Sequence, residues 1–229
     1  MNRSPATVLL ALDTSTRTVG VAIYDGFRVL SESTWTSQDY HTVELAPAVA
    51  EAFKKVDLNI DAVGAIAVAI GPGSFTGLRV GLALAKGLAL VRRIPLIGIP
   101  TMDILATAQP PLNIPMAIIL RAGRGRLAVG WYEVIEGDWK LTKKIKVLPT
   151  EELTQEMKAP AFICGELSEA ERLLIGRQLD YAQLASPAHC FRRPAFLAEL
   201  AWKHWQNGEI DNPISLSPIY LHYNEPIPG

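Results

Sequence analysis

Residues 62–93 read AVGAIAVAIGPGSFTGLRVGLALAKGLALVRR, and this stretch decides the fold. The run 63–70 is apolar, bounded by glycine and too short for a helix, so it predicts a buried strand. The loop 71–77 is dense in residues that interrupt regular structure. Residues 78–91 have a helical composition with almost no polar face, and such a helix needs burial on nearly every side. We therefore expect either a large domain or a partner around this helix.

Two rows of apolar residues follow the predicted helix. Small residues recur every four positions, which places them on one side, where another backbone can approach closely. Larger apolar residues form the row beside them, and the amphipathic pattern over 41–56 predicts a second helix. We predict that the two helices meet another subunit, and that Gly81→Arg or Ala85→Glu breaks this contact while the fold stays largely intact. The predicted interface residues are Val43, Ala46, Val49, Ala50, Phe53, Gly77, Val80, Gly81, Leu84, Ala85 and Leu88.

The two halves of the chain carry the same pattern. The first half predicts three strands in hairpin style, with Asp25-Gly26 as a turn signal, followed by helix, strand, helix and strand. A shift of 108 positions places Leu9–Tyr24 over Ala117–Tyr132, and in both copies a buried strand precedes a polar turn and an alternating strand. This similarity predicts an internal duplication within an α/β fold of mixed sheets and helices. The predicted domains are 1–108 and 109–229.

The composition is that of a globular protein. Of 229 residues, 49% are hydrophobic and 20% are charged, and the formal net charge is −1. This charge argues against binding to nucleic acid or membrane through charge alone. No apolar run approaches the roughly 18 residues of a membrane span, and no signal peptide is evident, so we expect a cytoplasmic protein. Cys164 and Cys190 lack a metal-binding spacing; a reduced pair is favoured, and a disulfide stays open.

Asp13 ends the first predicted strand. In a duplicated fold that clamps a nucleotide, acidic residues at both first-strand ends hold Mg²⁺ directly or through water. The second copy has Arg121 at this position, so the carboxylate pair is broken, and a local turn role for Asp13 is favoured. The loop 71–77 could cradle an anion, although helix capping by Ser74 or Thr76 is favoured. The weak candidate anion or nucleotide contacts are Asp13, Gly71, Gly73, Ser74 and Thr76.

Other candidate sites lack a required partner. His41 has Leu45 where a second metal ligand would stand, so an exposed or capping histidine is favoured. Ser74 lacks the second glycine of a nucleophile elbow. We therefore predict no catalytic residue, no metal site and no cofactor. Basic residues gather in the second half, where a solvated face is favoured over contact with RNA phosphates. They are Arg121, Arg124, Arg126, Lys140, Lys143, Lys144 and Lys146.

The glycine loop and its helix carry a family resemblance. The stretch Gly71–Arg79, with Gly81 and the run Ala85–Ala89, closely resembles the signature of the bacterial TsaB (YeaZ) family. One departure lies at 121–126, which reads RAGRGR where relatives often have the pattern D-A-R-x-G-E. We therefore expect contacts made through that turn to differ from those of the family. Further similar stretches are 10–15, 41–47, 97–101 and 218–221.

The resemblance implies an actin-like (ribonuclease H-like, ASKHA) fold and a role in making N6-threonylcarbamoyladenosine at position 37 of tRNAs that read codons starting with A. It implies a non-catalytic scaffold that binds a TsaD-type catalytic subunit, with a TsaE-type ATPase as a further partner. It also implies a homodimer when the subunit is isolated, and contact with tRNA only through the complex. An actin-like ATPase or phosphotransferase is the alternative. A peptidase is a remote one, because the sequence supplies no nucleophile and base for it.

Overall fold

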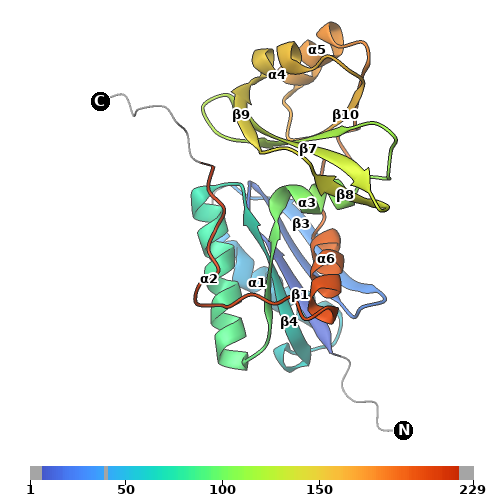
Figure 1. The fold of residues 1–229 in the computed structure, drawn as a ribbon. Coiled ribbons are helices and arrows are strands. Elements are labelled where there is room, and N and C mark those ends of the chain that lie inside the picture. Colours follow the sequence, from blue (N-terminus) through green and yellow to red (C-terminus); the bar gives the residue numbers. More distant parts are fainter. Residues whose placement is uncertain (1–6, 39–40, 222–229) are drawn as a thin grey trace.

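The first half of the chain forms a five-stranded mixed sheet, shown in the lower part of Figure 1. The computed structural model describes residues 7–38 and 41–221. The strands are β1 (Val8–Asp13), β2 (Thr18–Tyr24), β3 (Val29–Thr36), β4 (Val63–Gly71) and β5 (Leu96–Pro100). Their order is β3-β2-β1-β4-β5, with β1 antiparallel to β2 and parallel to β4. Every residue of β1 is buried, so this strand is the centre of the domain.

Helices cover both faces of this sheet (Figure 1). They are α1 (His41–Lys55), α2 (Phe75–Arg92), α3 (Thr101–Thr107) and α6 (Pro194–Gln206), with a 3-10 turn η1 (Ile60–Ala62) before β4. Val8, Leu10 and Leu12 of β1 pack with α1 and α2, whereas Leu9 and Ala11 pack with α6. This division follows from the alternation of side chains along a strand. Within the described residues, no helix is both long and apolar enough to cross a membrane.

The second half forms a six-stranded sheet with its own helices. The strands are β6 (Met116–Arg121), β7 (Arg126–Ile135), β8 (Asp138–Leu141), β9 (Lys146–Pro149), β10 (Ala161–Gly165) and β11 (Ala182–Leu184). Their order is β11-β10-β6-β7-β8, and β9 also pairs with β7. The helices α4 (Thr150–Glu156) and α5 (Glu169–Gln178) share one core with this sheet. Residues of α3 pack against its other face, so α3 lies between the two sheets (Figure 1).

The predicted duplication is confirmed by the strand pairing. β6 has an antiparallel neighbour β7 and a parallel neighbour β10, as β1 has β2 and β4. β1 and β6 also begin and end 108 positions apart. The hairpins differ by one residue, because Asp13 pairs with Gly20 but Arg121 pairs with Leu127. After β7, the second half has two short strands, β8 and β9, where the first half has β3. The duplicated strand order identifies the actin-like fold.

One helix crosses the predicted domain boundary. A division at 108/109 assigns α6 to the second half, but α6 packs on the first sheet with Leu197, Ala198 and Ala201 in its core. The chain then continues along the first half, where Ile219 N donates a 2.7 Å hydrogen bond to Ile70 O. We therefore propose that the first domain combines residues 7–108 with 194–221.

Candidate functional site

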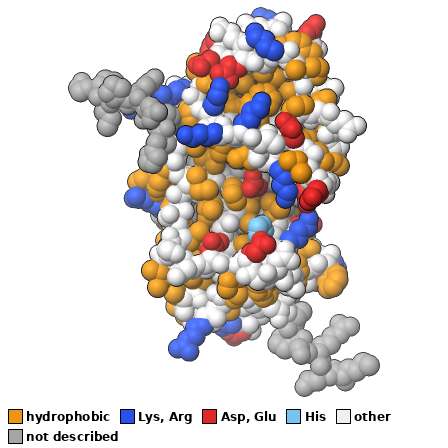
Figure 2. Space-filling model, in the orientation of Figure 1, with side chains coloured by type: hydrophobic (Ala, Val, Ile, Leu, Met, Phe, Trp, Pro, Cys, Tyr) orange, Lys and Arg blue, Asp and Glu red, His pale blue; other side chains and the backbone are white. Residues whose placement is uncertain are grey.

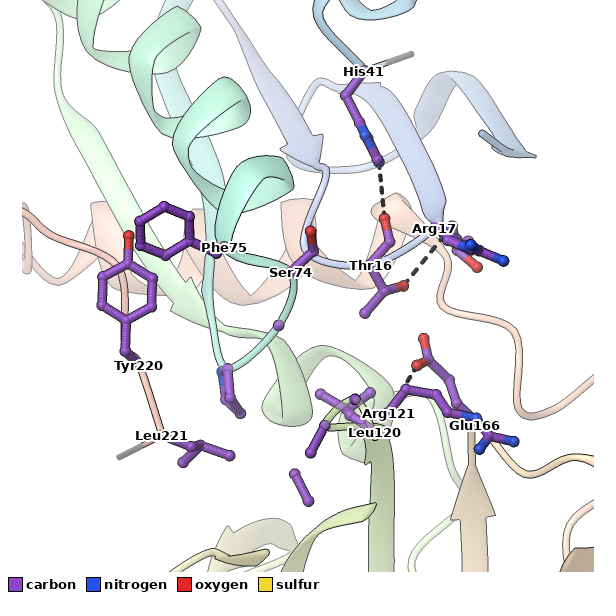
Figure 3. A pocket seen from close by; sticks show the side chains of 16 residues that line it. Thr16, Arg17, His41, Ser74, Phe75, Leu120, Arg121, Glu166, Tyr220 and Leu221 are labelled. Carbon is purple, nitrogen blue, oxygen red and sulfur yellow. Dashed lines mark hydrogen bonds between the residues drawn. The ribbon is translucent and has the colours of Figure 1, made fainter. Parts of the chain in front are cut away.

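A cavity of about 960 Å³ lies between the two halves of the chain. Its walls come from the β1–β2 turn, the start of α2, the ends of β6 and β10, and the C-terminal segment. Figure 3 shows Phe75 and Tyr220 together on one side, with Arg121 and Glu166 on another. In actin-like folds such a cleft between duplicated domains holds a nucleotide, so the groups at its base decide whether that chemistry is available here.

Asp13 is fully engaged within the protein. Its Oδ1 accepts hydrogen bonds from Ser15 N (2.9 Å) and Ser15 Oγ (2.5 Å), and its Oδ2 accepts one from Arg192 Nε (2.9 Å). The side chain is 3% exposed. The favoured local turn role for Asp13 is thus observed, with a long-range ion pair in addition. A magnesium ion needs carboxylate oxygens that are free to coordinate it, and the residues present do not fit one here.

Arg192 is a buried cation that contacts two residues of the cleft wall. Its guanidinium also donates from Nη1 to Glu166 Oε1 (2.9 Å) and from Nη2 to Thr16 Oγ1 (2.6 Å). The side chain is 1% exposed. Burial lowers the pKa of Arg192, but the carboxylates of Asp13 and Glu166 outweigh this effect and raise the pKa above its usual value. The arginine is therefore a permanent positive charge that joins the end of β1 to the end of β10.

Arg121 is held by α5 of its own domain. Its Nη1 and Nη2 donate to the two carboxylate oxygens of Glu171, at 3.0 and 2.6 Å. Glu171 also completes a capping box with Ser168 at the start of α5. Burial raises the pKa of Glu171, but hydrogen bonds from Ser168 and the charge of Arg121 outweigh it and lower the pKa overall. The bidentate geometry is that of a strong ion pair, so Arg121 is committed to this helix.

The glycine loop is held against the β1–β2 turn. Ser74 caps α2, because its Oγ accepts a 3.3 Å hydrogen bond from Gly77 N, and its backbone N–H donates to Ser15 O at 2.6 Å. Gly71 N donates to Thr101 Oγ1 at 3.1 Å. A Cβ at Gly73 would lie 2.0 Å from Ser15 O, so glycine is required for this close approach. The backbone N–H groups of Gly71 and Ser74 are therefore used inside the protein.

His41 differs from its expected place. The predicted exposed or capping histidine is wrong, because the side chain is buried at the start of α1. Its Nε2 lies 3.0 Å from Thr16 O, a hydrogen bond drawn in Figure 3. The reason is that α1 begins directly beside the β1–β2 turn, which no sequence spacing indicates. No group of three or more His, Cys, Asp or Glu side chains able to hold a metal ion is present among residues 7–38 and 41–221.

The small-residue row of α2 faces the chain's own core. A Cβ at Gly77 would lie 2.1 Å from Thr14 O, and one at Gly81 would lie 2.2 Å from Thr14 Oγ1. Thr14 Oγ1 also donates a 2.7 Å hydrogen bond to Gly77 O. The backbone that Gly77 and Gly81 approach is therefore the chain's own β1–β2 turn, and a contact of this row with another subunit stays a prediction. The predicted interface residues that are buried within the chain are Val49, Phe53, Gly77, Gly81 and Ala85.

The rest of the predicted interface reaches the surface. Val43 is 66% exposed, and Leu84 is half-buried in a groove of about 510 Å³ between α1 and α2. Figure 2 shows hydrophobic side chains at the surface of the lower half of the molecule, where α2 lies in Figure 1. We call the exposed and half-buried residues of this region the α1–α2 surface. Its residues are Val43, Ala46, Ala50, Val80, Leu84 and Leu88.

Comparisons with known proteins decide the family. A family model described as "TsaD: tRNA N6-adenosine threonylcarbamoyltransferase" matches residues 28–170. The chain is 31% identical over 169 residues to the tRNA threonylcarbamoyladenosine biosynthesis protein TsaB of Buchnera aphidicola, covering 69% of this chain and 78% of that protein. The chain belongs to the TsaB (YeaZ) family. This chain therefore shares part of its sequence pattern with the TsaD model.

Other TsaB relatives agree. The Haemophilus influenzae TsaB is 29% identical over 225 residues, with 93% of this chain and 92% of that protein covered. The Bacillus subtilis TsaB is 33% identical over 129 residues, and the matched region spans only 56% of this chain and 56% of that protein. The solved structure titled "YeaZ from Pseudomonas aeruginosa" is 28% identical, with a TM-score of 0.77 over 94% of this chain and 100% of that one. The TsaB similarity therefore extends over both sheets.

Proposed function

We propose that this protein is a non-catalytic subunit for the synthesis of threonylcarbamoyladenosine in tRNA, and that it binds and activates a TsaD-type catalytic subunit. The relatives are named for this biosynthesis. The observation that carries the proposal is the buried ion pair of Arg192 with Asp13, which uses the acidic group that a nucleotide-bound metal would need. A TsaE-type ATPase is the proposed further partner, tRNA is met through the complex, and the proposed location is the cytoplasm.

The α1–α2 surface is the proposed docking site. It combines exposed apolar side chains with a groove, and such a surface on a soluble protein marks a contact with another chain. The partner that fits it is a related actin-like chain presenting its own apolar helices. In the isolated protein a second copy would take this place, which accounts for the expected homodimer. Positive charge is available at the groove rim from Arg79, whose guanidinium carbon lies 3.7 Å from the centre of the Phe75 ring.

Co-purification with a co-expressed TsaD-type subunit tests the binding role. Leu84→Asp places a charge in the α1–α2 groove and is expected to abolish complex formation. Leu173→Asp is the matched control, because Leu173 is 51% exposed on α5 in the other half of the chain. Equal recovery of the partner with both variants would contradict the proposed docking site. Failure of both variants and of the unaltered protein to recover the partner would also contradict it.

An actin-like ATPase or phosphotransferase is the second candidate function. The observation in its favour is the 960 Å³ cleft with the glycine loop at its edge. The candidate contacts Asp13, Gly71, Gly73, Ser74 and Thr76 would then meet the nucleotide. Among these, Asp13 and Ser74 already make hydrogen bonds within the chain, which weighs against this role.

A further inference from the structure

The two cysteines of the chain are neighbours in the fold. Cys164 belongs to β10, and Cys190 lies in the turn that precedes α6. Both are free thiols, 26 positions apart in the sequence, and their Sγ atoms are 3.9 Å apart. The sequence left their pairing open because no motif spacing connects them. The distance shows that the fold brings one thiol against the other.

The surroundings of the pair differ between the two sulfurs. Cys164 is buried, whereas Cys190 is partly exposed. Arg172 Nη1 lies 4.0 Å from Cys190 Sγ, and Arg172 Nη2 donates a 2.5 Å hydrogen bond to Ala185 O, which fixes the guanidinium beside the sulfur. A positive charge next to a partly exposed sulfur favours its thiolate, the reactive form of cysteine.

Proton sharing strengthens this asymmetry. A hydrogen bond from Cys164 lowers the pKa of Cys190 to about 6, against the opposing effect of burial, and the backbone N–H of Gly165 and the guanidinium of Arg172 add to the lowering. The same hydrogen bond, together with burial, raises the pKa of Cys164. The surroundings of the pair therefore favour ionisation of Cys190 over ionisation of Cys164.

We propose that Cys164 and Cys190 form a reversible dithiol–disulfide pair, in which Cys190 attacks a small disulfide and Cys164 resolves the product. With oxidised glutathione, Cys190 Sγ bonds to one glutathione sulfur and the other glutathione leaves as a thiolate. Cys164 then loses its proton and attacks Cys190 Sγ, which releases the second glutathione. Two protein thiols become one disulfide, while one oxidised glutathione becomes two reduced molecules.

The required movement is small. Closing 3.9 Å to a disulfide of about 2.05 Å means an approach of about 2 Å. Cys164 is held in a paired strand, whereas the turn carrying Cys190 is held by short-range backbone hydrogen bonds to Ser186 O and Pro187 O and by one hydrogen bond from Gln109 Nε2 to His189 O. The turn is therefore the part that moves toward the strand.

The pair lies next to the buried ion pair between Glu166 and Arg192. Glu166 follows Cys164 by two positions, Arg192 follows Cys190 by two positions, and their ion pair is 2.9 Å long. A disulfide would thus tie together the two backbone segments that carry this ion pair. We expect the oxidised protein to unfold at a higher urea concentration than the reduced protein, because the cross-link restricts the unfolded chain.

The test incubates the full chain with oxidised glutathione and records intact mass and free thiols. The unaltered protein is expected to lose both thiols and the mass of two hydrogen atoms, and dithiothreitol is expected to restore both. Cys164→Ser should keep one glutathione on Cys190, because the resolving thiol is gone. Cys190→Ser should stay unmodified, because Cys164 is buried.

Three results would overturn the proposal. They are a stable glutathione adduct on the unaltered protein, disulfide-linked dimers on a non-reducing gel, and two thiols that remain free in glutathione but react after urea is added. Circular dichroism of the two serine variants shows whether each is folded. If Cys164→Ser were unfolded, Cys164→Ala would be used in its place, with the same expected adduct.

Discussion

Arg192 Nε lies 2.9 Å from Asp13 Oδ2, with both side chains almost fully buried where the two halves of the chain meet. The residues are 179 positions apart, and the same guanidinium also contacts Glu166 of the second half. Both carboxylate oxygens of Asp13 therefore accept hydrogen bonds from protein groups, namely Ser15 and Arg192. The packing of the two halves against each other is therefore expected to depend on the side chain of Arg192, and this dependence can be tested.

Arg192→Ala is expected to lower the free energy of unfolding by about 3–5 kcal/mol, because it leaves a buried carboxylate without its partner. Urea denaturation measures the change. The neighbouring Arg193→Ala is the control, since Arg193 is 55% exposed and pairs with Glu32 at the surface. Its loss should stay below about 1 kcal/mol. Similar small losses for both variants would show that the buried contact contributes little.

Substitution of two glycines of α2 distinguishes packing within the chain from contact with another subunit. Gly77→Ala is expected to destabilise the isolated chain by about 1–3 kcal/mol, because the new Cβ meets Thr14 O. Gly87→Ala meets nothing within 4 Å and should stabilise the helix by about 0.5–1 kcal/mol. Thermal or urea unfolding of both variants gives the comparison. If Gly77→Ala were instead as stable as the unaltered protein and changed its oligomeric state, the small-residue row of α2 would contact another subunit.

Calorimetry with Mg-ATP measures whether the cleft binds a nucleotide. We expect no binding heat at millimolar nucleotide, because the oxygens of Asp13 already accept hydrogen bonds from Ser15 and Arg192. Saturable binding that Asp13→Asn removes would support the ATPase alternative instead.

The burial of Asp103 predicts a pH dependence. Burial raises the pKa of Asp103 and outweighs the 2.5 Å hydrogen bond that Tyr132 OH donates to Asp103 Oδ1, which acts to lower it. The folded protein therefore holds this proton more tightly than the unfolded chain does. The resulting stability is fully present below the unfolded pKa of about 3.9 and is lost as pH rises through the folded pKa. Asp103→Asn should weaken the fall in unfolding free energy from pH 4 to 7, measured by urea denaturation. An unchanged slope would contradict the expectation.

The sequence predicted the parts of the fold that depend on local pattern. The strand at 63–70, the α2 helix and the 108-residue duplication follow from apolar runs, glycine positions and turn signals, all of which act over short distances. The packing of α6 on the first sheet was not predicted. Its apolar face indicates burial but does not specify which of two sheets covers it.

The candidate site was predicted less completely, for a physical reason. Asp13 was found because a carboxylate at a strand end is a recognisable position. Arg192 and Glu166 were missed because each contacts residues far away along the chain, and no spacing rule connects them. The glycine row of α2 did indicate close backbone approach. Sequence alone could not show that this backbone belongs to the same chain.

The central claim is that the chain acts by binding a catalytic partner through the α1–α2 surface. Threonylcarbamoylation of tRNA by a reconstituted TsaD-type subunit, its ATPase and the threonylcarbamoyl donor measures this most directly, with the unaltered chain, Leu84→Asp, Leu173→Asp or no chain added. We predict that tRNA is modified with the unaltered chain and with Leu173→Asp, and that modification falls to the level without the chain for Leu84→Asp. Equal modification in all four reactions, or modification by this chain without the TsaD-type subunit, would contradict the account.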